Sequence, residues 1–305
     1  MKGEFVRTTS GFRNWITRDG AAGETGSDGF KAEADRYHLY VSHACPWAHR
    51  TLIYRSLKGL NDAISVSVVH PLMPKTSWEF GEYPGSTPDH VNGAATMQEI
   101  YHLADPDFSG VVTVPVLWDK ERRTLVNNES SEIIRMLNSE FGDAGANDVD
   151  FYPEPLRSTI DTINDVVYEN VNNGVYRAGF ATTQEAYEKA FNNLFETLDK
   201  LEEMLANQRY LAGEKITEAD WRLFPTLVRF DSVYVGHFKC NRQRIVDYPN
   251  LWDYTRELYQ IPGVTDTINM HQIKYHYYAS HGSVNPTGIV PSGPEIDFDQ
   301  PHTRG

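Results

Sequence analysis

The apolar residues of this chain follow two different patterns, one in each half. In the first half they form short runs between turn-rich segments, which is typical of strands that alternate with helices. Residues 37–42 (YHLYVS) and 64–69 (ISVSVV) are rich in aromatic and β-branched side chains and predict two strands. The segment between them predicts a helix that begins at Pro46 and stops at Gly59. The sequence therefore predicts a β–α–β unit with Cys45 where the first strand meets the helix.

The rest of the first half continues this alternation. A long insertion rich in Pro and Gly, residues 71–93, precedes a predicted helix over 94–103. Strands are expected at 111–119, broken by Pro115, and at 124–126. A further helix begins at SSEIIRMLN after the turn NNES. The order β–α–β, α, β–β, α is that of a thioredoxin fold.

The second half has the three- and four-residue spacing of amphipathic helices. This spacing predicts helices within residues 186–206, 216–234 and 250–261, after an acidic, proline-bearing linker at 143–155. We therefore expect an α/β domain followed by an all-α domain. The boundaries are a thioredoxin-like domain with an irregular N-terminal extension at 1–150, a helical domain at 151–282 and an extended tail at 283–305.

Composition removes several classes of function. The formal net charge of −14 argues against a nucleic-acid partner, because phosphates need a basic surface. No apolar run approaches the roughly 18 residues of a membrane-spanning helix, and the N-terminus lacks the apolar stretch of a secretory signal. The two cysteines, Cys45 and Cys240, form no CxxC motif, which fits a reducing compartment. The sequence thus predicts a cytoplasmic protein that binds neither nucleic acid nor a membrane.

Cys45 is the candidate nucleophile. A helix N-terminus lowers the pKa of a thiol, because the helix dipole and the unpaired N–H groups stabilise the thiolate. The motif is CPWA, so Ala48 stands where a dithiol oxidoreductase has its resolving cysteine, and an external thiol must complete any disulfide chemistry. A buried, inert cysteine is the alternative. His43 and His49 flank Cys45, but their spacing matches no structural zinc pattern and a fourth ligand is lacking, so we expect no metal. We expect a surface role, or a role in tuning the pKa of the thiol, for these histidines and for Arg50.

Two further motifs suit a peptide-like ligand. In TVPVLWD, Val114 and Pro115 stand where thioredoxin-like proteins place a proline opposite the active-site helix, and the residue before it offers its backbone to the ligand. An edge-strand proline is the alternative. Glu129 and Ser130 open a helix, where Ser130 and backbone N–H groups suit the carboxylate of a γ-glutamyl group and Glu129 suits its ammonium. Plain helix capping is the alternative here.

Together these segments resemble the glutathione transferase superfamily, and within it the glutathionyl-hydroquinone reductases, or Xi class. The resemblance runs from about Phe5 to about Pro294. It is carried by SHACPWAHRTLI, TVPVLWDK, NNESSEIIRMLN, NGVYRAGFA, ITEADWRLFPTLVRFD, HFKCN and HYYASHGSVNPTGIVPSGP. It implies that the second domain is of the glutathione-transferase helical type, that glutathione is the co-substrate, and that the protein is a homodimer.

The resemblance also implies a reaction and its residues. Cys45 attacks the sulfur of a glutathionyl-hydroquinone, the hydroquinone leaves, and a second glutathione resolves the mixed disulfide. Trp78, Val114, Glu129 and Ser130 would hold glutathione. The hydroquinone would be contacted from the helical domain by Tyr176 and Tyr277, with Tyr278 as the alternate to Tyr277, because adjacent helical residues point in different directions. Core packing is the alternative for each tyrosine.

Two other functions remain open from the sequence. An omega-like thiol transferase or dehydroascorbate reductase would keep Cys45 but would not need the tyrosine pair. A non-catalytic binding protein with a transferase fold would need no thiol at the helix start, so the intact CPWA motif argues against it.

Overall fold

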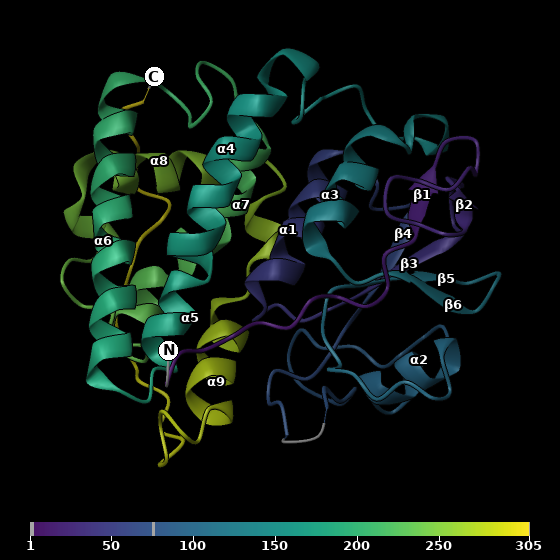
Figure 1. The fold of residues 1–305 in the computed structure, drawn as a ribbon, viewed down its shortest axis with the longest axis horizontal. Coiled ribbons are helices and arrows are strands. Elements are labelled where there is room, and N and C mark those ends of the chain that lie inside the picture. Colours follow the sequence, from purple (N-terminus) through teal and green to yellow (C-terminus); the bar gives the residue numbers. More distant parts are fainter. Residues whose placement is uncertain (1–2, 75–76, 305) are drawn as a thin grey trace. The chain divides into compact units, whose positions relative to one another are not determined.

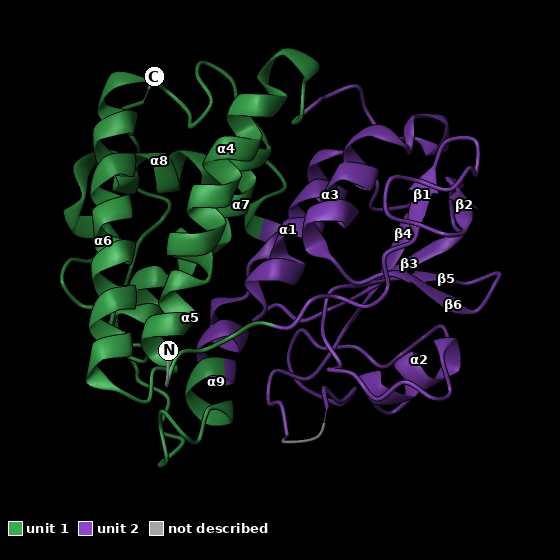
Figure 2. Ribbon diagram, viewed as in Figure 1, with its two compact units in different colours: residues 1–7, 151–265, 277–305 green, residues 8–150, 266–276 purple. Residues whose placement is uncertain are grey.

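The computed structural model describes residues 3–74 and 77–304 of the 305-residue chain (Figure 1). The chain divides into two compact units (Figure 2). Unit 1 consists of residues 1–7, 151–265 and 277–305, and unit 2 consists of residues 8–150 and 266–276. The units are not two continuous stretches of the chain. Residues 1–7 join the unit formed mainly by the second half, and residues 266–276 join the unit formed mainly by the first half. The domain boundaries predicted from the sequence stay a prediction.

A four-stranded mixed sheet forms the centre of unit 2, with strand order β4-β3-β5-β6. β3 pairs in parallel with β4 and antiparallel with β5, and β5 pairs antiparallel with β6. All five residues of β3 are buried, which agrees with its mostly apolar and aromatic sequence; His38 is the polar member. The strands are β3 (Tyr37–Val41), β4 (Ile64–Val68), β5 (Val116–Asp119) and β6 (Thr124–Asn127).

Three helices complete the thioredoxin-like arrangement of unit 2. They are α1 (Pro46–Leu57), α2 (Met97–Ala104) and α3 (Ser130–Ser139). Helices α1 and α3 pack against each other, and α2 lies on the opposite side of the sheet (Figure 1). Because α1 is the crossover between two parallel strands, its first turn lies at the carboxyl end of β3, the edge where ligands of α/β proteins bind.

Unit 1 is helical. Its long helices are α4 (Arg157–Val167), α6 (Gln184–Asn207), α7 (Glu218–Arg229) and α8 (Pro249–Tyr259), with the short α5 (Gly174–Gly179) between α4 and α6. Thr217 and Asp220 form a capping box at the start of α7. The last helix, α9 (Met270–Ser280), is divided between the units after His276. The predicted fold class, a thioredoxin-like domain and a helical domain, is therefore confirmed.

Two segments differ from the prediction in detail. The N-terminal extension is not wholly irregular, since β1 (Trp15–Thr17) and β2 (Gly29–Lys31) form a small parallel sheet. Strands of three residues are too short to produce a visible period. The strand expected at 111–119 begins only after Pro115, which has no N–H to give to a neighbouring strand.

The C-terminal tail has no regular secondary structure but is tied to unit 1. Phe298 stacks on Tyr259 with ring centroids 5.0 Å apart, and Arg304 forms an ion pair with the buried Glu257 at 2.8 Å. Residues that the sequence assigns to an extended tail are thus part of the packing of the helical unit.

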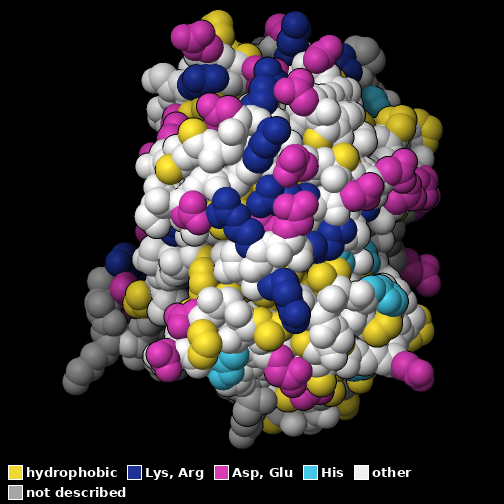
Figure 3. Space-filling view, turned by 90° about the vertical axis from the view of Figure 1, so that its right-hand side faces the viewer, with side chains coloured by type: hydrophobic (Ala, Val, Ile, Leu, Met, Phe, Trp, Pro, Cys, Tyr) yellow, Lys and Arg dark blue, Asp and Glu magenta, His cyan; other side chains and the backbone are white. Residues whose placement is uncertain are grey.

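Charged side chains of both signs are mixed on the surface. On the face drawn in Figure 3, Lys and Arg side chains lie among Asp and Glu side chains. Exposed ion pairs include Arg122 with Asp28 and Arg244 with Asp247. None of the helices in residues 3–74 and 77–304 has the length and apolar character needed to cross a membrane.

Candidate active site

Cys45 occupies the N-cap of α1. Its Sγ accepts a hydrogen bond from the Ala48 amide at 3.5 Å, and Pro46, which lacks an N–H, takes the first helical position. The thiol also donates to the Val114 carbonyl at 3.3 Å. The side chain is half-buried. The structure therefore places the thiol where backbone N–H groups and the helix dipole favour a negative charge.

Val114, the second predicted site residue, lies against Cys45 through this carbonyl. The Val114–Pro115 peptide bond is cis. The preceding residue, Thr113, bonds through its backbone and its hydroxyl to the buried Tyr101 hydroxyl, which in turn accepts from Asn128. This chain of contacts connects the Val114 segment to the turn before α3.

Glu129 and Ser130 begin α3, as predicted. Glu129 is the N-cap, and its carboxylate accepts from the Ser131 amide at 3.1 Å and from the Ser10 hydroxyl at 3.1 Å. Burial acts to raise the pKa of Glu129, but the hydrogen bonds from Ser131 and Ser10 and the charge of Arg50 outweigh it. The pKa therefore lies below that of an ordinary glutamate. A carboxylate that stays ionised at this position can bind an ammonium group.

Arg50 links the thiol helix to α3. It is almost fully buried, its guanidinium lies 4.6 Å from the centroid of the Trp47 ring, and its Nη1 donates to the Ser130 hydroxyl at 3.4 Å. From the sequence, Arg50 was expected only at the surface or as a group that tunes the pKa of the Cys45 thiol. Ser10, by contrast, lies in the extension and was missed, because nothing local in the sequence connects it to a residue 119 positions away.

His49 is not a surface residue. It is fully buried, and its Nε2 lies 2.8 Å from the Thr267 hydroxyl. The sequence left a surface or tuning role open, and burial excludes the first. Within residues 3–74 and 77–304, no group of three or more His, Cys, Asp or Glu side chains is arranged to hold a metal ion.

Trp78, the remaining predicted glutathione residue, is largely buried. Its ring stacks on His276 with centroids 4.8 Å apart and an interplanar angle of 22°. His276 is held in turn by the Pro71 carbonyl, 2.8 Å from its Nδ1. The position of the Trp78 ring therefore depends on both the long insertion after β4 and the first part of α9.

The predicted tyrosines gather in a separate cluster within unit 1. The hydroxyl groups of Tyr176 and Tyr277 lie 2.5 Å apart, and the Tyr234 hydroxyl lies 3.1 Å from that of Tyr277. Tyr277 and Tyr234 are fully buried, and burial raises the pKa of both well above that of an ordinary tyrosine. Phenols in this state remain protonated at neutral pH and act as hydrogen-bond donors.

Two tyrosines differ from the sequence prediction in whether they belong to the hydroxyl cluster. Tyr278 is half-buried, packs against the His237 ring and donates weakly to the Ser232 carbonyl at 3.5 Å, apart from the hydroxyl cluster. Tyr234 joins the cluster but was not predicted. It follows α7 in a wide turn, Phe230–Tyr234, so helical spacing gave no reason to group it with Tyr176. Its place at the end of the ITEADWRLFPTLVRFDSVY stretch was the available signal.

Cys240 contrasts with Cys45. Its side chain is fully buried, and burial raises the pKa of its thiol far above the usual range. A thiol that stays protonated is neither a nucleophile nor a thiolate ligand.

Comparisons with known proteins agree with this geometry. Residues 44–140 match the family model described as "Glutathione S-transferase, N-terminal domain", and residues 184–257 match "Glutathione S-transferase, C-terminal domain". The fold and the two domains therefore define a glutathione transferase.

Individual relatives show more narrowly which glutathione transferases this chain is similar to. The chain is 56% identical over 303 residues to the glutathionyl-hydroquinone reductase YqjG of Escherichia coli, covering 99% of this chain and 92% of the relative. It is 54% identical over 292 residues to the glutathionyl-hydroquinone reductase PcpF of Sphingobium chlorophenolicum, covering 96% and 90%. It is also 47% identical over 300 residues to the glutathione S-transferase omega-like 2 of Schizosaccharomyces pombe, covering 96% and 94%.

Solved structures give the same result. The glutathione-bound structure of E. coli YqjG superimposes with a TM-score of 0.95 at 56% identity, covering 96% of each chain. The Xi-class transferase of Natrialba magadii superimposes with a TM-score of 0.92 at 52% identity, covering 97% of this chain and 89% of that one. The chain belongs to the Xi class of glutathione transferases, the glutathionyl-hydroquinone reductase family.

Proposed function

We propose that this protein is a glutathionyl-hydroquinone reductase in which Cys45 is the nucleophile. The observation that carries the proposal is the position of Cys45. Its Sγ is the N-cap group of α1 and contacts the Val114 carbonyl, and Ala48 stands where a second cysteine would be needed for a dithiol mechanism. The names of the relatives YqjG and PcpF support the same reaction.

The first step exchanges one carbon–sulfur bond for a disulfide. The Cys45 thiolate attacks the glutathione sulfur of the conjugate, a sulfur–sulfur bond forms, and the bond from sulfur to the aromatic ring breaks. The electron pair of that bond goes to the ring carbon, which takes up a proton and leaves as the free hydroquinone. The ring is thereby reduced by two electrons, and Cys45 is oxidised to a mixed disulfide.

The second step restores the thiolate. A second glutathione attacks the glutathione sulfur of the mixed disulfide and releases glutathione disulfide, with Cys45 as the leaving group. Glutathione is therefore consumed as a co-substrate. The helix N-terminus at Cys45 favours this step, because it stabilises the departing thiolate.

Four residues of unit 2 are proposed to hold the glutathione moiety. The Val114 backbone would pair with the peptide, the Ser130 hydroxyl and the first turn of α3 would bind the γ-glutamyl carboxylate, and Glu129 would bind its ammonium group. Trp78 would pack on the tripeptide. The lowered pKa of Glu129 supports its part, since only the ionised carboxylate attracts an ammonium ion.

Tyr176 and Tyr277 are proposed to act on the hydroquinone half of the substrate. Negative charge develops on the aromatic fragment as its bond to sulfur breaks, and phenol donors near the ring oxygens stabilise that charge. The short contact between the two hydroxyls supports a shared role. Tyr278 donates elsewhere, so we assign it no part in this step.

The proposal is tested by incubating the protein with a glutathionyl-hydroquinone and glutathione. Free hydroquinone and glutathione disulfide should appear in equal amounts, and a glutathione adduct on Cys45 should be trapped when the second glutathione is withheld. Formation of hydroquinone without any adduct on Cys45 would contradict the mechanism.

A second candidate function is a general thiol transferase. The 47% identity to the omega-like transferase of S. pombe favours it, and it uses the same cysteine. Comparing the rates for a glutathionyl-hydroquinone and for dehydroascorbate separates the two, because only the first leaves as an aromatic fragment. A homodimer and a cytoplasmic location, both expected from the family resemblance and the composition, stay predictions.

A further inference from the structure

The first described residues of the chain lie on the tyrosine cluster of unit 1. Phe5 stacks on Tyr176 with ring centroids 6.2 Å apart and on Phe180 at 5.6 Å. A segment 170 residues away in sequence therefore covers one of the two tyrosines that we propose to act on the hydroquinone.

Arg7 makes the most specific contact of this segment. Its guanidinium lies 5.3 Å from the centroid of the Tyr176 ring, within the distance at which a cation interacts with an aromatic face. Its Nε donates to Asn173 Oδ1 at 3.0 Å, and Asn173 is buried one helical turn before Tyr176. The hydrogen bond to Asn173 holds the Arg7 guanidinium over the Tyr176 ring, so the position of this long side chain is defined.

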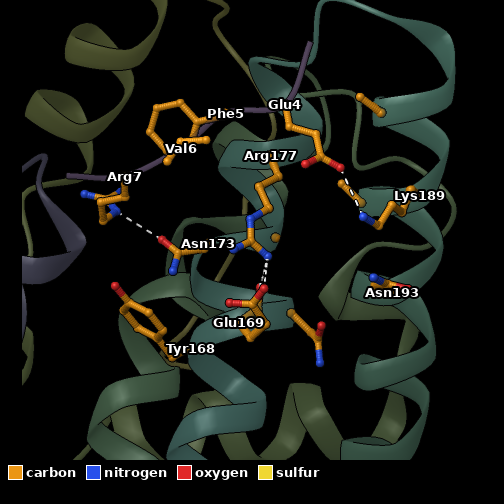
Figure 4. Close-up of a pocket in the computed structure, with 14 residues that line it drawn as sticks. Glu4, Phe5, Val6, Arg7, Tyr168, Glu169, Asn173, Arg177, Lys189 and Asn193 are labelled. Carbon is orange, nitrogen blue, oxygen red and sulfur yellow. Dashed lines mark hydrogen bonds and ion pairs between the residues drawn. The ribbon is translucent and has the colours of Figure 1, made fainter. Parts of the chain in front are cut away.

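The segment is attached by discrete contacts around a cavity. A cavity of about 350 Å³ is lined by Glu4, Phe5, Val6 and Arg7 together with residues of α5 and α6 (Figure 4). Glu4 forms an ion pair with Lys189 at 3.0 Å on one side of it, and Arg7 donates to Asn173 on the other side (Figure 4). Each attachment can therefore be removed by a single substitution without opening a packed core.

We propose that Arg7 is a positioning residue for Tyr176: it orients the phenol ring and favours negative charge on its hydroxyl. This inference rests on the function proposed above for Tyr176. A cation over a ring is attracted more strongly when the ring carries negative charge, so the Arg7 guanidinium makes the phenol a stronger donor to the leaving hydroquinone. Sequence reasoning could not find this contact, because no local pattern connects Arg7 with Tyr176.

The test compares Arg7→Met with Arg7→Lys. Arg7→Met keeps the length of the side chain but removes its charge, and it should lower kcat for a glutathionyl-hydroquinone about two- to fivefold, the range of an exposed cation–π contact. KM should change little, and Arg7→Lys should recover part of the loss. Reduction of a small glutathione mixed disulfide, which needs only Cys45, should be unchanged.

A double-mutant cycle shows whether the effect passes through the phenol. In the Tyr176→Phe background, Arg7→Met should have no further effect on kcat, because the hydroxyl on which Arg7 acts is absent. Equal losses from Arg7→Met in both backgrounds would overturn the inference.

Glu4→Gln is the matched control, because it removes an attachment of the same segment on the other side of the cavity. It should leave kcat within the error of the wild type, and a loss equal to that of Arg7→Met would overturn the inference in favour of simple anchoring. If the wild type does not turn over glutathionyl-hydroquinones, the proposed function fails instead.

Arg7 is then tested without turnover, by titrating protein labelled with ¹³Cζ-tyrosine and assigning Tyr176 from the Tyr176→Phe variant. Arg7→Met should move the ionisation of the Tyr176 phenol to higher pH. An unchanged titration would overturn the inference in this case too.

Discussion

The two clusters of site residues are held in place by different kinds of contact, one made mainly with backbone atoms and the other made between side chains. In unit 2, Cys45 is half-buried and is positioned mainly by backbone atoms, the Ala48 amide and the Val114 carbonyl. In unit 1, the hydroxyls of Tyr176, Tyr277 and Tyr234 bond to one another inside an aromatic core. A site made by the backbone keeps its geometry when a side chain is changed. A site made of buried side chains uses the same atoms for packing and for chemistry, so a substitution there affects both.

The largest effect is expected at Cys45. Cys45→Ala should lower both hydroquinone release and the reduction of mixed disulfides by at least about 10³-fold, since no other group can form the covalent intermediate. Stability should change little, because the backbone of α1 supplies its own geometry. Cys240→Ala is the control: activity should be kept, and equal losses in the two variants would contradict the assignment. Mass spectrometry after iodoacetamide treatment of the folded protein should find the label on Cys45 alone.

The tyrosine cluster should respond differently. Tyr176→Phe or Tyr277→Phe should lower kcat for glutathionyl-hydroquinones by about 10²–10³-fold, the effect of one lost oxyanion-type donor, and leave mixed-disulfide reduction nearly unchanged. Tyr277→Phe should also cost about 1–3 kcal/mol of stability, because it leaves the hydroxyls of Tyr176 and Tyr234 without this partner. Tyr278→Phe on the same helix is the matched control. Parallel losses in both assays would show that the tyrosines maintain the fold and do not contact substrate.

A third prediction concerns the sheet of unit 2 at acid pH. His38 on β3 is buried between the Ser65 and Ser67 hydroxyls, and burial lowers its pKa to about 4 from the 6.5 of an ordinary histidine. Between these two pH values the unfolded chain binds a proton that the folded chain does not. The free energy of unfolding should therefore fall as the pH falls from about 6.5 to 4, by up to about 3 kcal/mol from this group.

Urea unfolding at several pH values measures this fall. His38→Asn should flatten the dependence. An equally steep fall in the His38 variant would show that other groups cause it.

The smallest effect is expected where the tail joins unit 1. Arg304 and Arg209 share the buried Glu257 carboxylate, so Arg304→Met leaves one cation in place and should cost only about 1–2 kcal/mol. The exposed ion pair of Arg244 with Asp247 provides the control, and Arg244→Met should stay within about 0.5 kcal/mol. Thermal unfolding of both variants measures the difference. Equal destabilisation would mean that the tail contributes nothing beyond surface charge.

Much of unit 2 could be predicted from the sequence because its signals are local. Strand β3 is a run of aromatic and branched residues, and Pro46 and Gly59 mark the ends of the helix region that contains α1. The position of Cys45 follows from those two elements alone. The contact between Cys45 and Val114 did not follow, because it joins residues 69 positions apart, and only the resemblance to a known fold suggested it.

The sequence by itself determined the elements, their order and the position of the thiol, since strand alternation, helix periodicity and capping act within a few residues. Only the tertiary structure decided which tyrosines meet. Tyr277 and Tyr278 are neighbours in sequence, but one joins the hydroxyl cluster and the other turns to the Ser232 carbonyl. Tyr234 joins this cluster from a wide turn that follows α7, and Arg7 contacts the Tyr176 ring from the N-terminal segment. Contacts of this kind depend on packing between distant segments, for which a single sequence carries no periodic signal.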